Sequence, residues 1–519
     1  MTATEQLKPR TGVETGAGGS RGRWLALAVL VLAVLLVAVD ATVLGLATPS
    51  LSEDLEPSGT QLLWIGDIYS FVIAGLLVSM GSLGDRIGRK KLLLTGATAF
   101  GAVSVLTAHA SSPEMMIVAR ALLGVAGATL MPSTLALIRN IFTDPRERSL
   151  AIGIWGATAS AGAAVGPVVG GALLQHFYWG SVFLINLPVM IVLVLVGVKL
   201  LPESKNPVAG PWDLISVALS LVGVIGVVYA VKEAATHGPT WDAGLAVVIG
   251  AGALYAFVRR QFALPAPLLD MRLFKDRGFS GAVVADLLTV FGLSGLLFFL
   301  SQFLQLVQGR EPLEAGLAEL PAAIGAVVTG LVAGQWARRF SVRSVVAGGL
   351  GAIGLALGAL TLVRQDSGYA LLGASLLVVG LGAGFSFTVT ADVILSSVPK
   401  EQAGAASAVS ETAYELGAAL GIALLGSVVT GVYQGFTAPA GVPAPLAHAA
   451  HESLGGAVEA SGALDPQTGR TLLDSARDAF VDGLHYASGV SALVLLATAV
   501  AAWFLLRGQK LQEGAAAHH

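Results

Sequence analysis

The sequence predicts an all-α membrane protein, and three observations support this prediction. Of its 519 residues, 55% are hydrophobic and only 12% are charged. Its mean hydropathy is +0.77, whereas an average soluble domain has about 25% charged residues. Long apolar segments also alternate regularly with short breaks that contain proline, glycine or charge. Most of the chain is therefore expected to lie in lipid.

A helix needs about 20 apolar residues to cross a bilayer, and fourteen segments meet this length. We expect them to begin near Trp24, Leu62, Lys91, Met115, Leu150, Gly180, Asp213, Ala243, Phe279, Ala315, Val342, Tyr369, Ala403 and His485. Residues 1–23 are polar and rich in glycine and serine, which predicts a disordered cytoplasmic tail. The one long break, 434–484, is expected to be an extracellular loop that contains an amphipathic helix.

The distribution of basic residues predicts the orientation, because cytoplasmic loops carry an excess of lysine and arginine. With fourteen spans and both termini in the cytoplasm, most of the 30 basic residues lie in inner segments. Those left outside are Lys232, Arg310, Arg364, Arg470 and Arg477, and Arg120 alone lies within a span. The chain is thus expected to be a multi-pass protein of a cell membrane.

Composition also excludes several classes of function. The chain has no cysteine, which rules out thiol chemistry, disulfides and cysteine-ligated metals. Its net charge is −3 and its basic residues are dispersed, so we expect no nucleic-acid partner. No nucleophile–base pair, metal cluster or phosphate-binding loop is recognisable, so we expect neither an enzyme nor a cofactor or metal site.

The break between the second and third spans has a specific pattern, GSLGDRIGRKKLLL. Its glycines permit a tight connection between closely packed helix ends, and Asp85 is placed to face the N-terminus of a neighbouring helix. We expect a cytoplasmic gate formed by Gly81, Gly84, Asp85, Arg86, Gly88 and Arg89.

This pattern, GxLxDrxGRkxxL, resembles the signature of the major facilitator superfamily. Further matches are RALLGVAGATLMPS from Arg120, GAAVGPVVGG from Gly162, and LLVAVDATVLGLATPSL around Asp40. Fourteen spans make the chain similar to the drug:proton antiporter branch of EmrB-like and QacA-like multidrug exporters.

The resemblance implies a major facilitator fold with two six-helix bundles and an extra helix pair. The expected organisation is the tail 1–23, a bundle at 24–201, the extra pair at 210–262, a second bundle at 278–506 with the loop 434–484, and a cytoplasmic tail at 507–519. The resemblance also implies that the fifth span contains an antiporter motif at the interface between the bundles. Its glycines allow close helix packing, and its proline adds a bend. The motif residues are Gly162, Gly166, Pro167, Gly170 and Gly171.

Ionised carboxylates within a membrane are costly, roughly 2.5–3.5 kcal/mol or more, so acids inside the spans are candidate functional residues. We expect proton-coupling and cation-binding roles for Asp40, Asp67, Glu411, Glu415, Asp286 and Asp392, with Arg120 as a partner of an acid. The spacing of Glu411 and Glu415 places both carboxyls on one helix face, where each raises the proton affinity of the other.

These acids suggest an exchange mechanism. A deprotonated carboxylate attracts a lipophilic cation, and an arriving proton removes that attraction, so the two displace each other. Aromatic faces would add cation–π contacts in a substrate cavity. The candidates are Trp64, Tyr69, Phe298, Phe303, Phe387 and Tyr414.

The resemblance suggests quaternary ammonium compounds, dyes and fluoroquinolones as substrates. Two alternatives remain open at this point: an exporter dedicated to one self-made antibiotic, and a proton-coupled nutrient symporter. The expected partners are small-molecule drugs, protons and the lipid bilayer, and we expect a functional monomer.

Overall fold

The computed structural model describes residues 19–57, 59–206, 213–238, 240–265, 267–399 and 402–509. Within these ranges the chain forms helices joined by short connections. Most of the two expected tails therefore lies outside the described residues.

The first half contains six spans, and the sixth is broken into two helices. The bounds are α1 Gly19–Leu55, α2 Gly59–Ile87, α3 Arg89–Ala108, α4 Pro113–Ile141, α5 Pro145–His176, α6 Ser181–Leu184 and α7 Asn186–Leu200. Ser112 and Asp144 cap α4 and α5, each accepting hydrogen bonds from backbone N–H groups of the first turn. The two N–H donors hold the pKa of Asp144 below its usual range.

An additional helix hairpin follows, formed by α8 (Leu214–His237) and α9 (Trp241–Ala263). Asp213 caps α8, and its two carboxylate oxygens accept hydrogen bonds from Arg260 of α9 at 2.7 and 3.0 Å. This pairing with Arg260 holds the pKa of Asp213 well below its usual range. The hairpin packs against α2 and α14.

The second half contains six further spans and three additional short helices. The bounds are η1 Met271–Lys275, α10 Arg277–Gln302 with its π-helical extension η2 Phe303–Val307, α11 Pro312–Phe340, α12 Val342–Leu360, α13 Tyr369–Ser396, α14 Ala403–Tyr433, α15 Ala444–Glu452, α16 Leu454–Gly462 and α17 Pro466–Leu505. Each half has its own main hydrophobic core, and at the contact between the halves Val78 joins the second core while Ala391 and Leu395 join the first.

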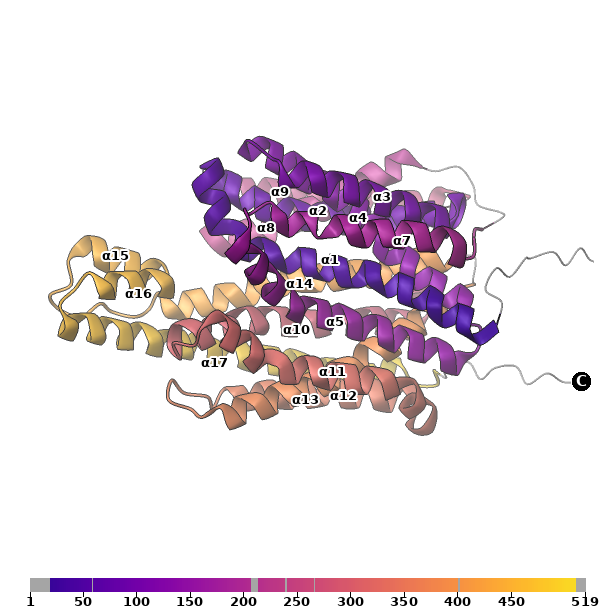
Figure 1. The fold of residues 1–519 in the computed structure, drawn as a ribbon. Helices are drawn as coiled ribbons and strands as arrows, with labels where there is room; N and C mark the ends of the chain where they lie inside the picture. The colour runs from indigo at the N-terminus through magenta and orange to yellow at the C-terminus, as the bar shows by residue number, and fades with distance from the viewer. Residues whose placement is uncertain are drawn as a thin grey trace, which may run out of the picture.

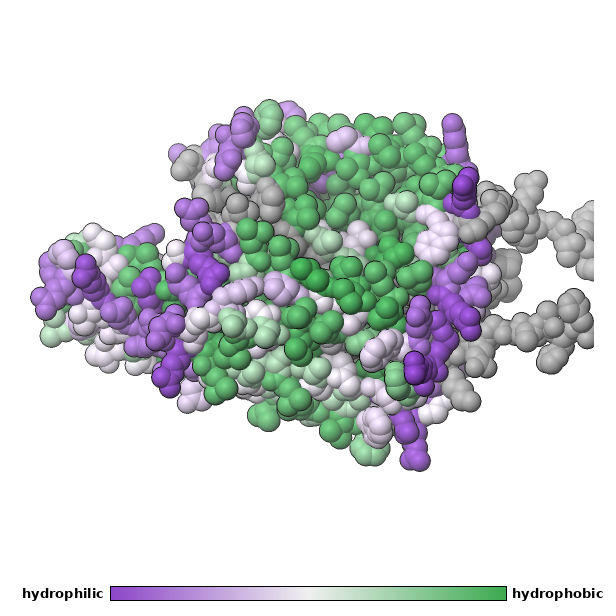
Figure 2. Space-filling view, turned by 60° about the horizontal axis from the view of Figure 1, so that its bottom comes forward, coloured by the Kyte–Doolittle hydropathy of each residue, from purple (hydrophilic) through white to green (hydrophobic). Residues whose placement is uncertain are grey.

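The long helices lie side by side, and α1 begins at the same end of the molecule at which α17 ends (Figure 1). We call this the termini end. Figure 2 shows a belt of hydrophobic surface between two hydrophilic borders. Among the described residues, 13 helices are long and apolar enough to cross a membrane. The 32-residue α5 packs among them as a further span, which confirms the predicted all-helical membrane fold with about fourteen spans.

The last span differs from the sequence prediction, which starts it near His485. The structure has one continuous helix of 40 residues from Pro466, so the amphipathic segment belongs to α17. Asp465 caps its N-terminus, and no proline interrupts the helix before the apolar stretch, so the helical period continues. Together with α15 and α16, this first part of α17 projects beyond the hydrophobic belt (Figures 1 and 2).

The two halves meet along a seam where α5 contacts α11 and α2 contacts α14. At two of these contacts the backbones approach so closely that no residue larger than glycine fits. A Cβ on Gly81 would lie 2.3 Å from the carbonyl oxygen of Gly404, and one on Gly153 would lie 2.2 Å from that of Gly330. All four residues lie toward the termini end, so the halves are in close contact there.

Candidate functional site

A buried ion pair occupies the middle of the first half. Asp40 of α1 and Arg120 of α4 are 1% and 2% exposed, and Oδ2 lies 3.3 Å from Nη1. Asn186 donates a hydrogen bond of 2.9 Å to the other carboxylate oxygen and a second one to Ser104. Arg120, which we expected to be the partner of an acid, thus pairs with Asp40, and the amide of Asn186 also donates to this carboxylate.

Sequence reasoning missed Asn186. It lies at the start of α7, directly after the break that separates α6 from α7. The signal available in the sequence was a single asparagine in an apolar segment, LINLPVMIV, preceding a proline. Its position beside Asp40 depends on the packing of α7 against α1.

Tyr69 of α2 links this pair to the second half. The guanidinium of Arg120 lies 4.4 Å from the centre of the Tyr69 ring and donates a hydrogen bond to the carbonyl of Ile65. Tyr69 lies within electrostatic range of both Asp40 and Glu415, which come from different halves. Its buried hydroxyl has no hydrogen-bond partner among the described residues.

The second half has its own group of carboxyls. Asp286 of α10 accepts hydrogen bonds from Ser410 at 2.8 Å and Thr390 at 3.3 Å. Glu411 is buried beside it, within electrostatic range of Asp286 and Glu415. Glu415, one turn farther along α14, is only partly buried.

Tyr414 and Phe387 form an aromatic pair next to these acids. Their ring centres are 6.1 Å apart, and Tyr414 is 46% exposed. The pair thus offers an accessible aromatic face beside a partly exposed carboxyl, Glu415.

Other predicted cavity residues lie elsewhere or cannot be placed. Trp64 stacks on Tyr229 of α8 at 6.1 Å, so it contacts the additional hairpin. Phe303 is completely buried in the core of the second half. The side chains of Asp67 and Phe298 lie outside the described part of the structure.

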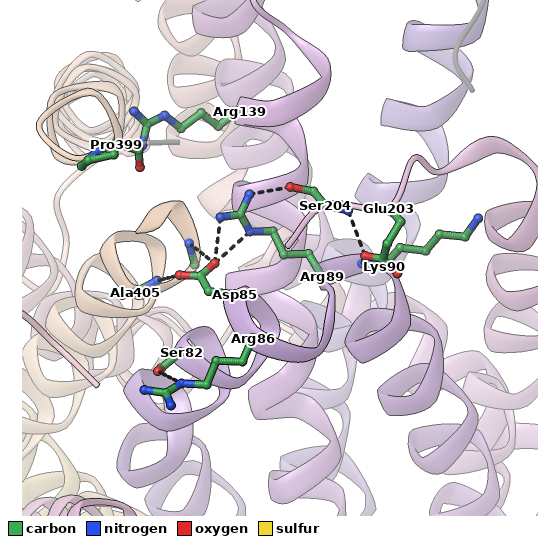
Figure 3. A network of polar contacts seen from close by, with 11 residues as sticks. Ser82, Asp85, Arg86, Arg89, Lys90, Arg139, Glu203, Ser204, Pro399 and Ala405 are labelled. Atoms are coloured by element: carbon green, nitrogen blue, oxygen red, sulfur yellow. Dashed lines mark hydrogen bonds and ion pairs between the residues drawn. The ribbon is translucent and has the colours of Figure 1, made fainter. Parts of the chain in front are cut away.

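The predicted gate residue Asp85 lies at the seam, close to the termini end. Its Oδ1 and Oδ2 accept hydrogen bonds of 3.0 and 3.1 Å from the N–H groups of Gly404 and Ala405, in the first turn of α14 (Figure 3). Arg89 holds the carboxylate from the other side, with Nη2 2.8 Å from Oδ1. A negative charge here is stabilised by the N-terminal end of the α14 dipole. We call this contact between the halves the latch.

The segment after α7 supports the latch, which the sequence did not suggest. Glu203 accepts a hydrogen bond from the N–H of Lys90, and Ser204 accepts one from Arg89 (Figure 3). Glu203 also accepts one from the N–H of Lys91. Gly88 has a φ of 114°, a conformation that favours glycine, and it makes the turn between α2 and α3. Nearby, Arg86 donates to Ser82 of its own helix at 3.3 Å, while Gly84 packs closely on Leu92.

Asp392 was expected to couple protons, but the structure places it in a second contact across the seam. Its carboxylate pairs with Arg148 at 2.9 Å and accepts a hydrogen bond from Ser149 at 2.7 Å, both at the start of α5. Arg139 of α4 donates to the carbonyl of Pro399, just beyond the end of α13 (Figure 3). It also donates to the carbonyl of Val398. Asp392 therefore has a cationic partner from the opposite half.

The antiporter motif lies in a different position from the one expected. A Cβ on Gly162 would meet Ala38 and Leu35 at 2.8–2.9 Å, and one on Gly166 would lie 1.9 Å from Oγ1 of Thr42. These glycines thus pack α5 against α1 within the first half, and the seam uses Gly153 instead. Gly170 is also buried, Gly171 has open space around it, and the side chain of Pro167 is not described.

Two helical bundles that enclose buried carboxyls and close against each other at one end define a membrane transporter of small molecules. The chain belongs to the Major Facilitator Superfamily, whose profile matches residues 30–422. This confirms the predicted resemblance.

Two bacterial proteins show how similar sequences are described. The chain is 48% identical to the multidrug efflux pump LfrA of Mycolicibacterium smegmatis, over 92% of this chain and 95% of that one. It is 37% identical to the methyl viologen resistance protein SmvA of Salmonella typhimurium, over 93% and 98%. Among solved structures, the human organic anion transporter MFSD10 has the same fold, with a TM-score of 0.61 at 14% identity, covering 93% of this chain and 99% of that one.

Proposed function

We propose that this protein exports lipophilic cationic drugs from a bacterial cell in exchange for protons. The observation that carries the proposal is the partly buried carboxyl of Glu415 beside the accessible ring of Tyr414, in the middle of a membrane-spanning helix. An acid and an aromatic face together suit a cation that is also apolar. The names of the relatives agree, because methyl viologen is an aromatic dication.

Proton coupling is supported by the arrangement of the other titratable groups. Tyr69 of the first half lies within electrostatic range of both the Asp40–Arg120 pair and Glu415, and Glu415 interacts with Glu411 in the second half. A proton and a cation compete for the same carboxylate of Glu415, so binding of one excludes the other. The proposed substrates are quaternary ammonium compounds, dyes and fluoroquinolones, carried by a monomer.

We further propose that the termini end faces the cytoplasm. The latch residues and the arginines at this end then obey the positive-inside rule. With the halves in contact there, the arrangement is the one closed to the cytoplasm. Release of Asp85 from α14 would accompany opening, as one half rocks against the other.

The test uses the full chain in inverted membrane vesicles whose lumen is acidified by respiration. Adding ethidium or methyl viologen should release lumenal protons, seen as a rise in lumenal pH. Glu415→Gln should abolish this rise, whereas Glu459→Gln, the same change on an exposed residue of α16, should leave it intact. Undiminished cation-driven proton release by Glu415→Gln, or transport unaffected by collapse of the pH gradient and voltage, would overturn the proposal.

A further inference from the structure

A polar crevice opens at the termini end of the seam, on the side formed by α5 and α11. Its volume is about 920 Å³, and it is lined by the start of α5, from Asp144 to Leu150, and by the end of α11, from Leu331 to Arg339. Figure 1 shows these two helices side by side at the outside of the molecule. The crevice is therefore shared by both halves and lies where the hydrophobic belt meets its hydrophilic border.

The charges in the crevice are unbalanced. Three arginines and two acids line it. Glu147 pairs with Arg23 at 2.9 Å, and Asp144 caps α5 and lies within electrostatic range of Arg146 and Arg338, so the arginines remain in excess. Among the described residues, no carboxylate lies within ion-pair distance of Arg146, Arg338 or Arg339. Nη1 of Arg338 is buried and has no hydrogen-bond partner in the described chain. A buried donor without a partner costs about 1–3 kcal/mol, so the crevice favours an anion.

An apolar groove lies next to the crevice, on the adjoining face of α11. It has a volume of about 390 Å³ and is lined almost entirely by apolar surface. Its walls carry the aromatic rings of Trp336, Phe340 and Phe385, and its floor is made by glycines where α12 approaches α13. Arg339, which lines the crevice, lies over the ring of Phe340, with its guanidinium 5.5 Å from the ring centre.

We propose that the crevice and the groove together bind one anionic phospholipid, with its phosphate among Arg146, Arg338 and Arg339 and one acyl chain along Trp336 and Phe340. Guanidinium groups bind phosphate through paired, charge-assisted hydrogen bonds. The adjoining groove requires an apolar chain attached to that phosphate, which a free phosphate ion lacks.

The bound lipid has a conformational consequence. Arg146 belongs to α5, and the other two arginines belong to α11, so like charges face each other across the seam. A phosphate between them replaces this repulsion by attraction to both halves. An anionic lipid therefore favours the arrangement in which the halves are closed at the termini end.

The test measures binding and so stands apart from the transport assay. The purified chain is reconstituted in phosphatidylcholine with a small fraction of phosphatidylglycerol brominated on its acyl chains, which quenches nearby tryptophan, including Trp336. Quenching should exceed that by brominated phosphatidylcholine at the same fraction, and Trp336→Phe should remove most of the excess.

Matched variants locate the site. Arg338→Gln with Arg339→Gln should weaken phosphatidylglycerol binding about tenfold or more, because charge-assisted hydrogen bonds are lost. Arg338→Lys should retain more binding than Arg338→Gln, and Arg259→Gln, an exposed arginine of α9, should retain it fully. Gly348→Leu should block the groove, while Gly351→Leu, which also points into open space but does not line the groove, should not.

Three results would overturn the proposal. One is equal quenching by the two brominated lipids. Another is unchanged binding in the double arginine variant. The third is full displacement of the lipid by millimolar inorganic phosphate, which would assign the crevice to a free anion.

Discussion

Asp40 and Arg120 have opposite charges and are both almost completely buried, so each depends on the other. Removing one partner of such a pair leaves an uncompensated charge, at a cost of about 3–5 kcal/mol. Arg120 would keep a carbonyl acceptor and an aromatic ring but would lose the carboxylate with which it pairs among the described residues.

We expect Asp40→Asn to lower the free energy of unfolding by roughly 3 kcal/mol or more, and Asp40→Asn with Arg120→Gln to cost less than the sum of the single changes. Thermal unfolding in detergent micelles measures both effects. Arg23→Gln is the control, since the Arg23–Glu147 pair is about 30% exposed and should contribute less than about 1 kcal/mol. Equal effects for Asp40→Asn and Arg23→Gln would contradict the assignment.

At the scale of the helices, α5 packs against α1 through the antiporter motif. Oγ1 of Thr42 donates to the carbonyl of Val39 at 3.0 Å, and Gly166 fits over it. An added methyl group would collide with this hydroxyl, and the β-branched side chain has few alternative rotamers.

Gly166→Ala should therefore destabilise the protein by about 1–3 kcal/mol, as overpacking does. Gly171→Ala makes the same change in helix propensity on the same helix but has open space around it, so it should be neutral or slightly stabilising. Adding Thr42→Ala to Gly166→Ala should restore most of the loss, which thermal unfolding will show. A double variant no more stable than Gly166→Ala would rule out this contact as the cause.

The helices also show where sequence reasoning succeeded and where it did not. Hydropathy located the starts of most spans to within a few residues, because each span must bury its backbone within lipid. It placed the start of α17 at His485, because hydropathy detects the apolar segment and not the helix that extends beyond it. The glycines of the antiporter motif predicted that α5 packs closely on another helix but not which one, since a face of small residues fits any neighbouring helix equally well.

At the scale of the whole molecule, the latch joins the two halves at the termini end, and we proposed above that its release accompanies opening. Asp85 makes one of the contacts that join α2 to α14. A negative charge at a helix N-terminus stabilises such a contact by up to about 2 kcal/mol in partly buried geometry. Its neutralisation should shift the balance toward the arrangement open at the termini end.

We expect Asp85→Asn to increase the ratio of open to closed molecules by about five- to thirtyfold, corresponding to about 1–2 kcal/mol. The chain has no cysteine, so spin labels at Lys91→Cys and Lys275→Cys, exposed on opposite halves, report the distance without background. Double electron–electron resonance should show a larger population of long distances between the two labels in Asp85→Asn. The exposed Asp366→Asn should not change the distribution, and an unchanged distribution in Asp85→Asn would remove the latch from the mechanism.

The sequence by itself determined the membrane class, the approximate number of spans, the superfamily and the identity of the buried acids. These follow from local rules, because the cost of polar groups in lipid acts on each segment separately. Only the tertiary structure decided the partners: Asn186 for Asp40, Arg148 for Asp392, Glu203 beneath the latch, and the arginines that meet across α5 and α11. Those contacts join residues up to 244 positions apart, and they depend on how the helices pack, which no single segment specifies.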